Sequence, residues 1–396
     1  MATNGRSAPV NAGLRLLGTA FAVFAAGLPA PLCAQRSGAA PAWSLQEDVR
    51  IGGQSDGPAN LLDIRGIGLT RQGNIFVLEF KDQELRVFSA SGTFLRRAAR
   101  RGAGPGEIAN ANGIAIGTDD VVWVNDPSNG RFSLFRADGT FLKQVVTPIR
   151  GFAYIWHGRV VGPDRIIDDL PVNVPTGRTD PVTGRPAFES RLRFVSADGK
   201  ADTLDFPRCK SQPIAAASTL VFNHAGQRGQ SYVSLPFQPW QQLAFTDLRT
   251  VWCTPSDEYR VLTGPVGGTL SEVVHRQFPP VTVTDEEHRR EAARIDSFRT
   301  MYGPPASGDP SAIPRTKPAI ARIFADDQGQ VWVRRNGVPA AKPVFEVYDA
   351  SGRQVATVTS SGPVGDQTFI AHDALLTVVN DADDVPFVVR YRIVRR

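Results

Sequence analysis

Three observations in the sequence predict an all-β fold, namely a single six-bladed β-propeller with four-stranded antiparallel blades. First, residues 67–100 and 114–147 repeat one pattern of short apolar runs and polar turns, with Gly92 and Gly139 at equivalent positions. Second, 37 glycines and 30 prolines are spread along 396 residues, as many short strands joined by turns require. Third, four strands in a repeat of ~40–50 residues are typical of a propeller blade.

The first 34 residues have the pattern of a secretory signal peptide. Arg6 and Arg15 accompany the apolar run LRLLGTAFAVFAAGL, prolines interrupt it, and the small residue Ala34 ends it. We therefore expect cleavage near Ala34, a flexible mature N-terminus over 35–42, and an exported protein that is periplasmic or secreted. This apolar run is shorter than the ~18–20 uninterrupted residues that a transmembrane helix needs, and no later segment offers a candidate span.

The remaining chain, residues 43–396, is expected to form the propeller. A weaker copy of the repeat covers 321–360, and fainter copies lie between 150 and 283. The last repeat has three strands of its own, so the strand 43–52 is expected to supply its outer strand and to close the ring. The six blades are expected at 61–97, 107–147, 150–208, 232–283, 316–360, and 364–396 together with 43–52.

Aromatic residues recur in the second strand of these repeats. Trp123, Trp252 and Trp332 occupy equivalent positions in the runs VWV, VWC and VWV. Equivalent aromatic residues in stacked blades are expected to pack between the blades rather than to form a ligand cage.

One helix is predicted, near 284–302. Thr284 and Glu287 have the spacing of a capping box, and Ile295 and Phe298 belong to a narrow apolar stripe. We expect this helix to be an insertion before the fifth blade that lies over one end of the ring. His288 and Glu291 share a face of the helix, but no third metal ligand accompanies them.

The segment GAGPGE (102–107) raises the question of a phosphate-binding loop. Such a loop follows a strand and opens a helix, whose aligned amides attract the anion. Here the following residues, ANANGIAIGTDDVVWV, predict a strand, a turn and another strand. The segment is therefore expected to be a turn that leads from one blade to the next.

These residues also carry a family resemblance. GAGPGEIANANGIAI, with FSASGTFLRRAAR before it and VVWVNDPSNGRFSLFRADGTFL after it, resembles the pattern of NHL-type six-bladed propellers. It is more closely similar to exported bacterial six-bladed β-propeller proteins, and the similarity covers nearly the whole mature chain. The resemblance implies the fold but leaves the function open, because propellers include scaffolds, binders, lyases and hydrolases.

The charge of the chain argues against a nucleic-acid partner. The formal net charge is +5, and removal of Arg6 and Arg15 with the leader lowers it to +3. Pairs of arginines, including 334–335, are scattered and are interpreted as solvated charges at loops and strand ends, not as a stripe that follows phosphates. We expect a soluble monomer.

Three cysteines are present in the full chain. Cys209 and Cys253 remain after cleavage and could form one disulfide in an oxidising compartment, or stay as two free thiols. Neither lies in an arrangement that binds zinc. Cys33 offers an alternative to simple cleavage, in which its thiol is acylated and anchors the protein to lipid.

Candidate ligand-binding residues are polar side chains that precede or enter the first strands and could line the mouth of the central channel. This set, suited to an anion or another polar ligand, comprises Arg65, Asn112, Arg191 and Arg322. The favoured function is therefore a non-enzymatic propeller of the cell envelope or exterior that binds a small molecule or an envelope protein.

The alternative function is a metal-assisted lyase or hydrolase, similar in layout to propeller lactonases or peptidyl-hydroxyglycine lyases. Calcium or zinc in the channel would need acidic, Asn or His ligands from several blades, and the five histidines follow no such pattern. We therefore expect no metal site and no cofactor. Ser231 and His224 lack the GxSxG elbow of a nucleophilic serine.

Overall fold

The computed structural model describes residues 40–148, 158–162, 164–179, 186–209, 219–224, 230–246 and 249–395. The predicted signal peptide, the cleavage position and Cys33 lie outside this part. The described residues are mostly strand, as predicted, and are organised as mainly antiparallel sheets. None of them forms a helix with the length and apolar character that crossing a bilayer requires.

Two sheets follow the repeat that is clearest in the sequence. The first contains β2 (Ile64–Leu69), β3 (Ile75–Glu79), β4 (Glu84–Phe88), β5 (Phe94–Arg101) and the short β6 (Glu107–Ile108). The second contains β7 (Ile114–Ile116), β8 (Val122–Asp126), β9 (Arg131–Phe135) and β10 (Phe141–Val146). In each sheet the second and third strands are buried almost completely, as strands covered on both faces must be.

Two further sheets lie in the middle of the chain. One contains β11 (Gly158–Gly162), β12 (Arg165–Thr179), β13 (Pro186–Ser196) and β14 (Ala201–Asp205). The other contains β17 (Gln242–Phe245), β18 (Thr250–Thr254), β19 (Tyr259–Pro265) and β20 (Ser271–Arg276). The hairpin of β12 and β13 is longer than the other strands of its sheet, because it contains the insert that interrupts the repeat.

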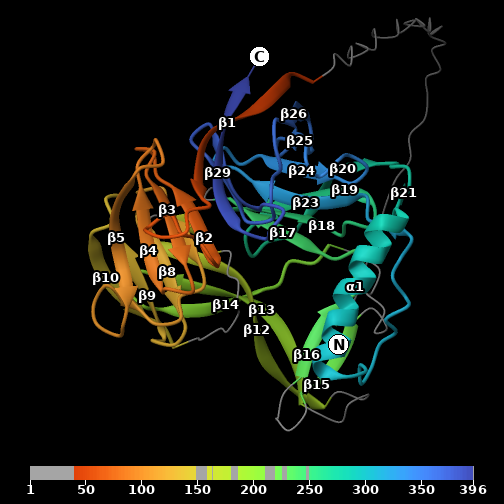
Figure 1. Ribbon diagram of the computed structural model, residues 1–396, viewed down its shortest axis with the longest axis horizontal. Coiled ribbons are helices and arrows are strands. Elements are labelled where there is room, and N and C mark those ends of the chain that lie inside the picture. The colour runs from red at the N-terminus through yellow and green to blue at the C-terminus, as the bar shows by residue number, and fades with distance from the viewer. Residues whose placement is uncertain are drawn as a thin grey trace, which may run out of the picture. The chain divides into compact units, whose positions relative to one another are not determined.

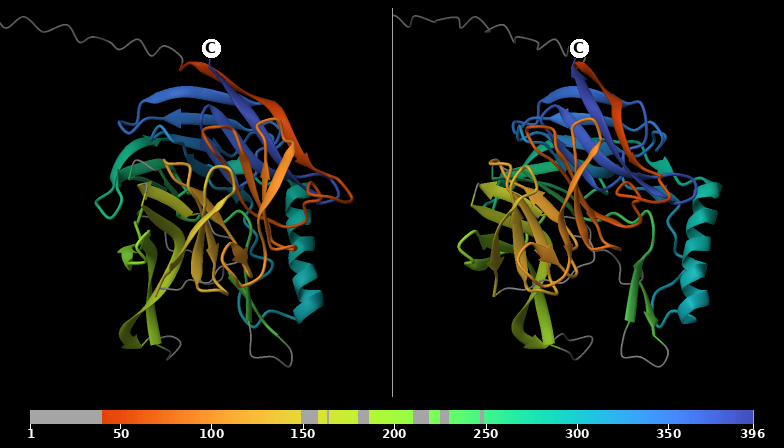
Figure 2. Two further views of the ribbon diagram at one scale, coloured as in Figure 1. Left: turned by 90° about the vertical axis from the view of Figure 1, so that its left-hand side faces the viewer. Right: turned by 60° about the vertical axis from the view of Figure 1, so that its left-hand side comes forward.

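The last two groups of strands are joined into one eight-stranded sheet. One group contains β23 (Ile320–Ala325), β24 (Val331–Arg335), β25 (Val344–Tyr348) and β26 (Gln354–Ser360), and the other contains β27 (Thr368–Ala371), β28 (Ala374–Asn380) and β29 (Pro386–Arg395). Strand β1 (Ala42–Gly52) lies between the two groups and pairs antiparallel with β29, as predicted for 43–52 (Figure 2). Its first residues also pair parallel with β26, which the sequence did not predict.

The first strands of neighbouring sheets contact one another. Strand β2 packs against β7 and β27, β7 packs against β11, and β23 packs against β17 and β27. Side chains from β2, β3 and β28 share one buried apolar cluster, so the beginning and the end of the chain pack together.

The three equivalent tryptophans lie in second strands and are at most 1% exposed. Trp123 packs with residues of β12 and β13, Trp252 with residues of β23 and β24, and Trp332 with residues of β27 and β28. Each tryptophan therefore shares an apolar cluster with the group of strands that follows its own group, which confirms the predicted packing role.

The segment GAGPGE is a connection, as predicted. It runs from β5 through β6 to β7, and no helix follows it. The Glu107 carboxylate accepts a hydrogen bond from Gly104 N at 2.9 Å, and Arg100 holds it from the other side at 3.1 Å. A Cβ at Gly102 would lie 2.1 Å from Glu107 Oε2, so a larger residue there would require the Glu107 side chain to move.

A small substructure lies outside the four-stranded groups. Helix α1 (Asp285–Tyr302) begins after the predicted Thr284 cap, with both hydrogen bonds of the capping box present. It lies beside the hairpin of β15 (Thr219–Asn223) and β16 (Gln230–Ser234), as Figure 1 shows. Ile295 and Phe298 pack on Phe222 of this hairpin, so the helix position is set by the hairpin. Strands β21 (Val281–Thr282) and β22 (Thr316–Lys317) pair at the base of the insertion.

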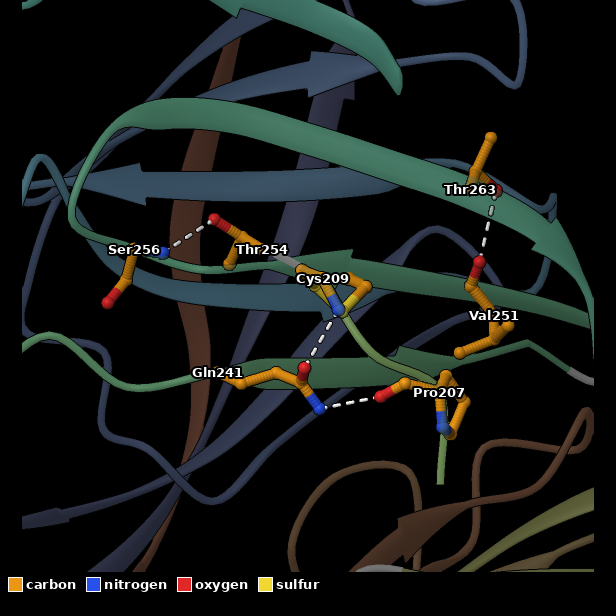
Figure 3. The surroundings of a disulfide bond; sticks show 8 residues. Pro207, Cys209, Gln241, Val251, Thr254, Ser256 and Thr263 are labelled. Carbon is orange, nitrogen blue, oxygen red and sulfur yellow. Dashed lines mark hydrogen bonds between the residues drawn. A yellow bond between two sulfur atoms is a disulfide. The ribbon is translucent and has the colours of Figure 1, made fainter. Parts of the chain in front are cut away.

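Cys209 and Cys253 form a disulfide, which resolves the two alternatives left by the sequence (Figure 3). Cys253 belongs to β18, and Cys209 lies on the segment that leaves β14. The Gln241 side chain holds the same segment, because it accepts from Cys209 N at 2.8 Å and donates to Pro207 O at 2.6 Å (Figure 3). The bridge therefore fastens the connection between two sheets.

Candidate functional site

The four predicted channel-mouth residues lie in four different sheets. Arg65 and Arg322 are in the first strands β2 and β23, and Asn112 lies two residues before the first strand β7. Arg191 lies in β13, the third strand of its sheet, rather than at a first strand as the sequence suggested. It is paired across to β14, where the Asp205 carboxylate lies 3.7 Å from its Nε.

The two arginines in first strands have aromatic neighbours. Arg65 forms a two-point ion pair with Asp63, at 2.6 and 2.8 Å, and its guanidinium lies 4.2 Å from the centre of the Phe80 ring. The Arg322 guanidinium lies 5.1 Å from the centre of the Trp240 ring, and Trp240 is 43% exposed. Both arginines are thus held by local contacts at the start of their sheets.

Asn112 belongs to a buried polar contact between two sheets. It accepts a hydrogen bond from Asn125 Nδ2 at 3.2 Å, and Asn125 Oδ1 in turn accepts from Arg193 at 3.5 Å. Arg193 is ion-paired with Asp168, and both side chains are almost fully buried. This chain joins β8 to β12 and β13, so Asn112 supports the packing of neighbouring sheets.

A cavity with ligand-sized dimensions lies elsewhere among the described residues, where the β17–β20 sheet meets the β23–β26 strands; it is larger than a second cavity of about 340 Å³ beside helix α1. We call the larger cavity the 276–337 groove. It has a volume of about 610 Å³ and is lined by Arg276, Gln277, Phe278, Pro279, Pro280, Val281, Thr282, Arg335, Asn336 and Gly337. Small-molecule sites usually have volumes of roughly 300–1,000 Å³. Loops at the end of β20 and after β24 form its walls, so its shape depends on how the two sheets meet.

A buried carboxylate supports one side of the groove. Glu346 of β25 is 7% exposed and accepts hydrogen bonds from Arg276, Tyr259 and Tyr348, the last at 3.2 Å. Burial raises the pKa of Tyr348 to about 12 and the pKa of Tyr259 further, so both phenols keep their protons and donate at neutral pH. The Arg276 guanidinium lies 3.9 Å from the centre of the Tyr259 ring.

The second arginine of the groove is held differently. Arg335 ends β24, and in the described part of the chain its guanidinium makes no hydrogen bond. Its Nη1 lies 3.9 Å from Glu346 Oε1, which is an ion pair without hydrogen-bond contact, and it lies 5.9 Å from the centre of the Phe278 ring. The side chain is 36% exposed. An arginine has five N–H donors in a planar fork, and those of Arg335 have no protein acceptor here.

Three charged side chains, two arginines and one glutamate, give the groove an excess of positive charge. The guanidinium groups of Arg276 and Arg335 flank the single carboxylate of Glu346, so this cluster carries a net charge of about +1 at neutral pH. These residues were not among the candidates predicted from the sequence. Arg335 was interpreted as a solvated strand-end charge, and Arg276 and Glu346 come from different repeats that only the packing of the sheets brings together.

A smaller recess lies where four first strands end. It has a volume of about 60 Å³ and is lined by apolar residues of β7, β17, β23 and β27 and by residues that follow these strands, among them Asp326, Asp327 and His372. His372 Nδ1 lies 3.3 Å from Asp327 Oδ2, and His372 N donates to the same oxygen at 2.9 Å. This volume suits a few water molecules rather than an organic ligand.

Two other residue groups from the sequence analysis can be placed. His224 Nε2 and Ser231 Oγ lie 2.8 Å apart on the hairpin of β15 and β16, and the His224 ring stacks on Tyr302 at 4.8 Å. They therefore do meet, in a local contact of the hairpin with helix α1. Across the described residues, no group of three or more His, Cys, Asp and Glu side chains is arranged to hold a metal ion.

Comparison with known proteins identifies the fold. A family model named DUF5128 and described as a 6-bladed beta-propeller matches residues 60–149. None of the curated proteins matches the chain. Together with the sheet topology, this family match identifies a β-propeller fold.

Solved propeller-type structures are similar over most of the chain, at low identity. A DUF4221 family member from Bacteroides vulgatus is 9% identical, with 89% of this chain and 99% of that chain covered and a TM-score of 0.48. A protein of Bacteroides fragilis described as exported is 11% identical, with coverages of 89% and 95% and a TM-score of 0.42. A gluconolactonase from Xanthomonas campestris is 13% identical, with coverages of 84% and 86% and a TM-score of 0.39. At these values the three structures carry no argument about function.

Proposed function

We propose that this protein is a non-enzymatic binding propeller of the cell envelope or exterior, and that it binds a small ligand in the 276–337 groove. Its six blades form one ring, which β1 closes. The pairing of β1 with β29 and the apolar cluster that β2 shares with β28 support this closure. The pattern of the first 34 residues supports export.

The observation that carries the proposal is the state of Arg335. A partly exposed guanidinium without a hydrogen-bond acceptor in the described chain lines a groove of about 610 Å³. Holding a charged side chain in a fixed position costs conformational entropy. The contacts of Arg335 with Phe278 and with the distant Glu346 offset little of this free-energy cost. A ligand that accepts hydrogen bonds from Arg335 would supply the missing contacts.

The chemistry of the lining favours binding over catalysis. The described lining consists of arginines, amides, prolines, a threonine and apolar groups. An arginine keeps its proton at neutral pH and is therefore a poor general acid or base. Glu346 lies behind the wall and already accepts from two tyrosines and Arg276, so it is not placed to remove a proton from a ligand.

A ligand-observed NMR screen tests this proposal. A fragment library that contains acids, bases and neutral compounds is screened against the mature protein and against Gln277→Trp, which fills the groove from an exposed position. Gln54→Trp, at an exposed loop position outside the groove, is the matched control. We expect a set of fragments that bind the wild type and Gln54→Trp but not Gln277→Trp. A screen without such fragments would refute the proposal.

A further inference from the structure

We infer that the ligand of the 276–337 groove is an amphipathic organic acid with one carboxylate, which Arg335 holds, and with a ring or other apolar body that lies along Phe278, Pro279, Pro280 and Val281. This inference rests on the proposed function, because it names the class of ligand for the same groove.

The hydrogen-bond geometry of Arg335 favours a carboxylate. The guanidinium presents parallel N–H pairs, and a planar carboxylate accepts two of them at once. In the part of the chain that the structure describes, the carboxylate paired with Arg335 is that of Glu346, and its Oε1 is 3.9 Å away, beyond hydrogen-bond distance. The other oxygen of Glu346 already accepts from Arg276, Tyr259 and Tyr348. Glu346 therefore leaves Arg335 with donors for an external carboxylate.

The charge of the groove favours a monoanion. Two guanidinium groups and one carboxylate leave an excess of about one positive charge, which one ligand carboxylate neutralises. A phosphate monoester with nearly two negative charges would leave the site negative, with Glu346 close by. The charge balance of the groove therefore favours a carboxylate over a phosphate monoester.

Part of the groove lining, next to Arg335, is apolar. Residues 278–281 are Phe-Pro-Pro-Val, and Phe278 is partly buried, with its ring centre 5.6 Å from that of Tyr259. Prolines fix their own backbone, so this wall is stiff and can receive a ring with little loss of entropy. A groove of this size accommodates a ligand of roughly 10–20 non-hydrogen atoms.

Isothermal titration with matched compounds tests the inference. The probes are naphthaleneacetate, its uncharged amide naphthaleneacetamide, and naphthyl phosphate, which share one ring body. We expect naphthaleneacetate to bind about 10- to 100-fold more tightly than the amide, as charge-assisted hydrogen bonds predict. We expect naphthyl phosphate to bind more weakly than the carboxylate.

Three variants locate the carboxylate. Arg335→Gln should reduce naphthaleneacetate binding to the level of the amide, and Arg335→Lys should restore part of the difference, because it keeps the charge but not the fork. Arg353→Gln, which removes an exposed arginine paired with Asp349 on a turn, should change nothing. Gln277→Glu adds a negative charge to the groove without changing a residue of the Glu346 cluster, so it should weaken the binding of naphthaleneacetate but not of the amide. This variant replaces Arg335→Gln in the test if Arg335→Gln fails to fold.

The outcomes separate the two proposals. If the acid and the amide bind equally and Gln277→Trp abolishes both, the groove binds ligands but the carboxylate inference is wrong. If naphthyl phosphate binds most tightly, the inference is overturned in favour of a phosphate ligand. If no probe or library fragment depends on the groove, the proposed function fails as well.

Discussion

The disulfide between Cys209 and Cys253 allows a quantitative prediction about stability. The two cysteines are 44 residues apart, and both are buried. In the chain-entropy account, a bridge that closes a loop of this length removes about 13 cal/mol/K of entropy from the unfolded chain, which is about 4 kcal/mol at 25 °C. Removal of the bridge should therefore lower the free energy of unfolding by about this amount.

Urea unfolding measures the effect. The oxidised protein is compared with the Cys209→Ala, Cys253→Ala double variant and with the reduced wild type, which retains both sulfur atoms in the core. Both should unfold at lower urea, and the double variant should lose slightly more because it also leaves a small cavity. A difference below about 1 kcal/mol for the reduced protein, or two reactive thiols in the denatured unreduced protein, would refute the reasoning.

Three further predictions concern stability. Burial raises the pKa of Asp326 to about 6 from its ordinary 3.8, so the folded state binds an extra proton between about pH 4 and pH 6 and loses stability as the pH rises through this window. In urea unfolding, the stability of Asp326→Asn relative to wild type should therefore increase by about 2–3 kcal/mol from pH 4 to pH 7. An equal difference at both pH values would contradict this. Leu45→Ala should cost about 2–5 kcal/mol in thermal or urea unfolding, because this residue of β1 is 1% exposed in the terminal sheet; a loss under about 1 kcal/mol would mean that β1 is not a structural strand. Ile295→Ala should increase proteolysis within α1 and the β15–β16 hairpin, whereas the main unfolding transition should change little. The reason is that the apolar cluster of α1 and this hairpin is separate from the clusters of the other sheets. Unchanged proteolysis would show that α1 is held by other contacts.

Much of the fold could be predicted because the positions of its strands and turns follow from the repeats. The alternation of strands and turns places the sheets, the aligned tryptophans of the second strands indicate their packing, and the capping box of Thr284 and Glu287 places the start of α1. The pairing of 43–52 with the last strand follows from the missing fourth strand there. These features depend on local pattern and on repeat count, which a sequence displays.

The hairpin of β15 and β16 could not be predicted in the same way. It belongs to no repeat, and its apolar partner Phe298 lies about 75 residues further along the chain than Phe222. The sequence therefore shows an apolar stripe on the helix but not what covers it. The prediction that α1 lies over one end of the ring therefore named no contact partner, and the structure supplies one in the hairpin.

The groove also depends on contacts between repeats. Arg276 ends β20, Arg335 ends β24 and Glu346 lies in β25, so nothing in the local sequence of any one of them indicates the other two. The register of β24 with β23 places Arg335 opposite Ile320, at the end of the sheet that faces β20. One signal was available, because Arg335 follows a buried strand, but the same signal marks many solvated charges.

The most direct test of the 276–337 groove as the binding site is the dissociation constant of a groove-binding fragment. It is measured for the mature protein and for Gln277→Trp, with Gln54→Trp as the control. The account predicts a dissociation constant at least about tenfold higher for Gln277→Trp and unchanged for Gln54→Trp, because an indole in the groove removes the contacts of the ligand. Equal dissociation constants for all three proteins would contradict the claim that this groove is the binding site.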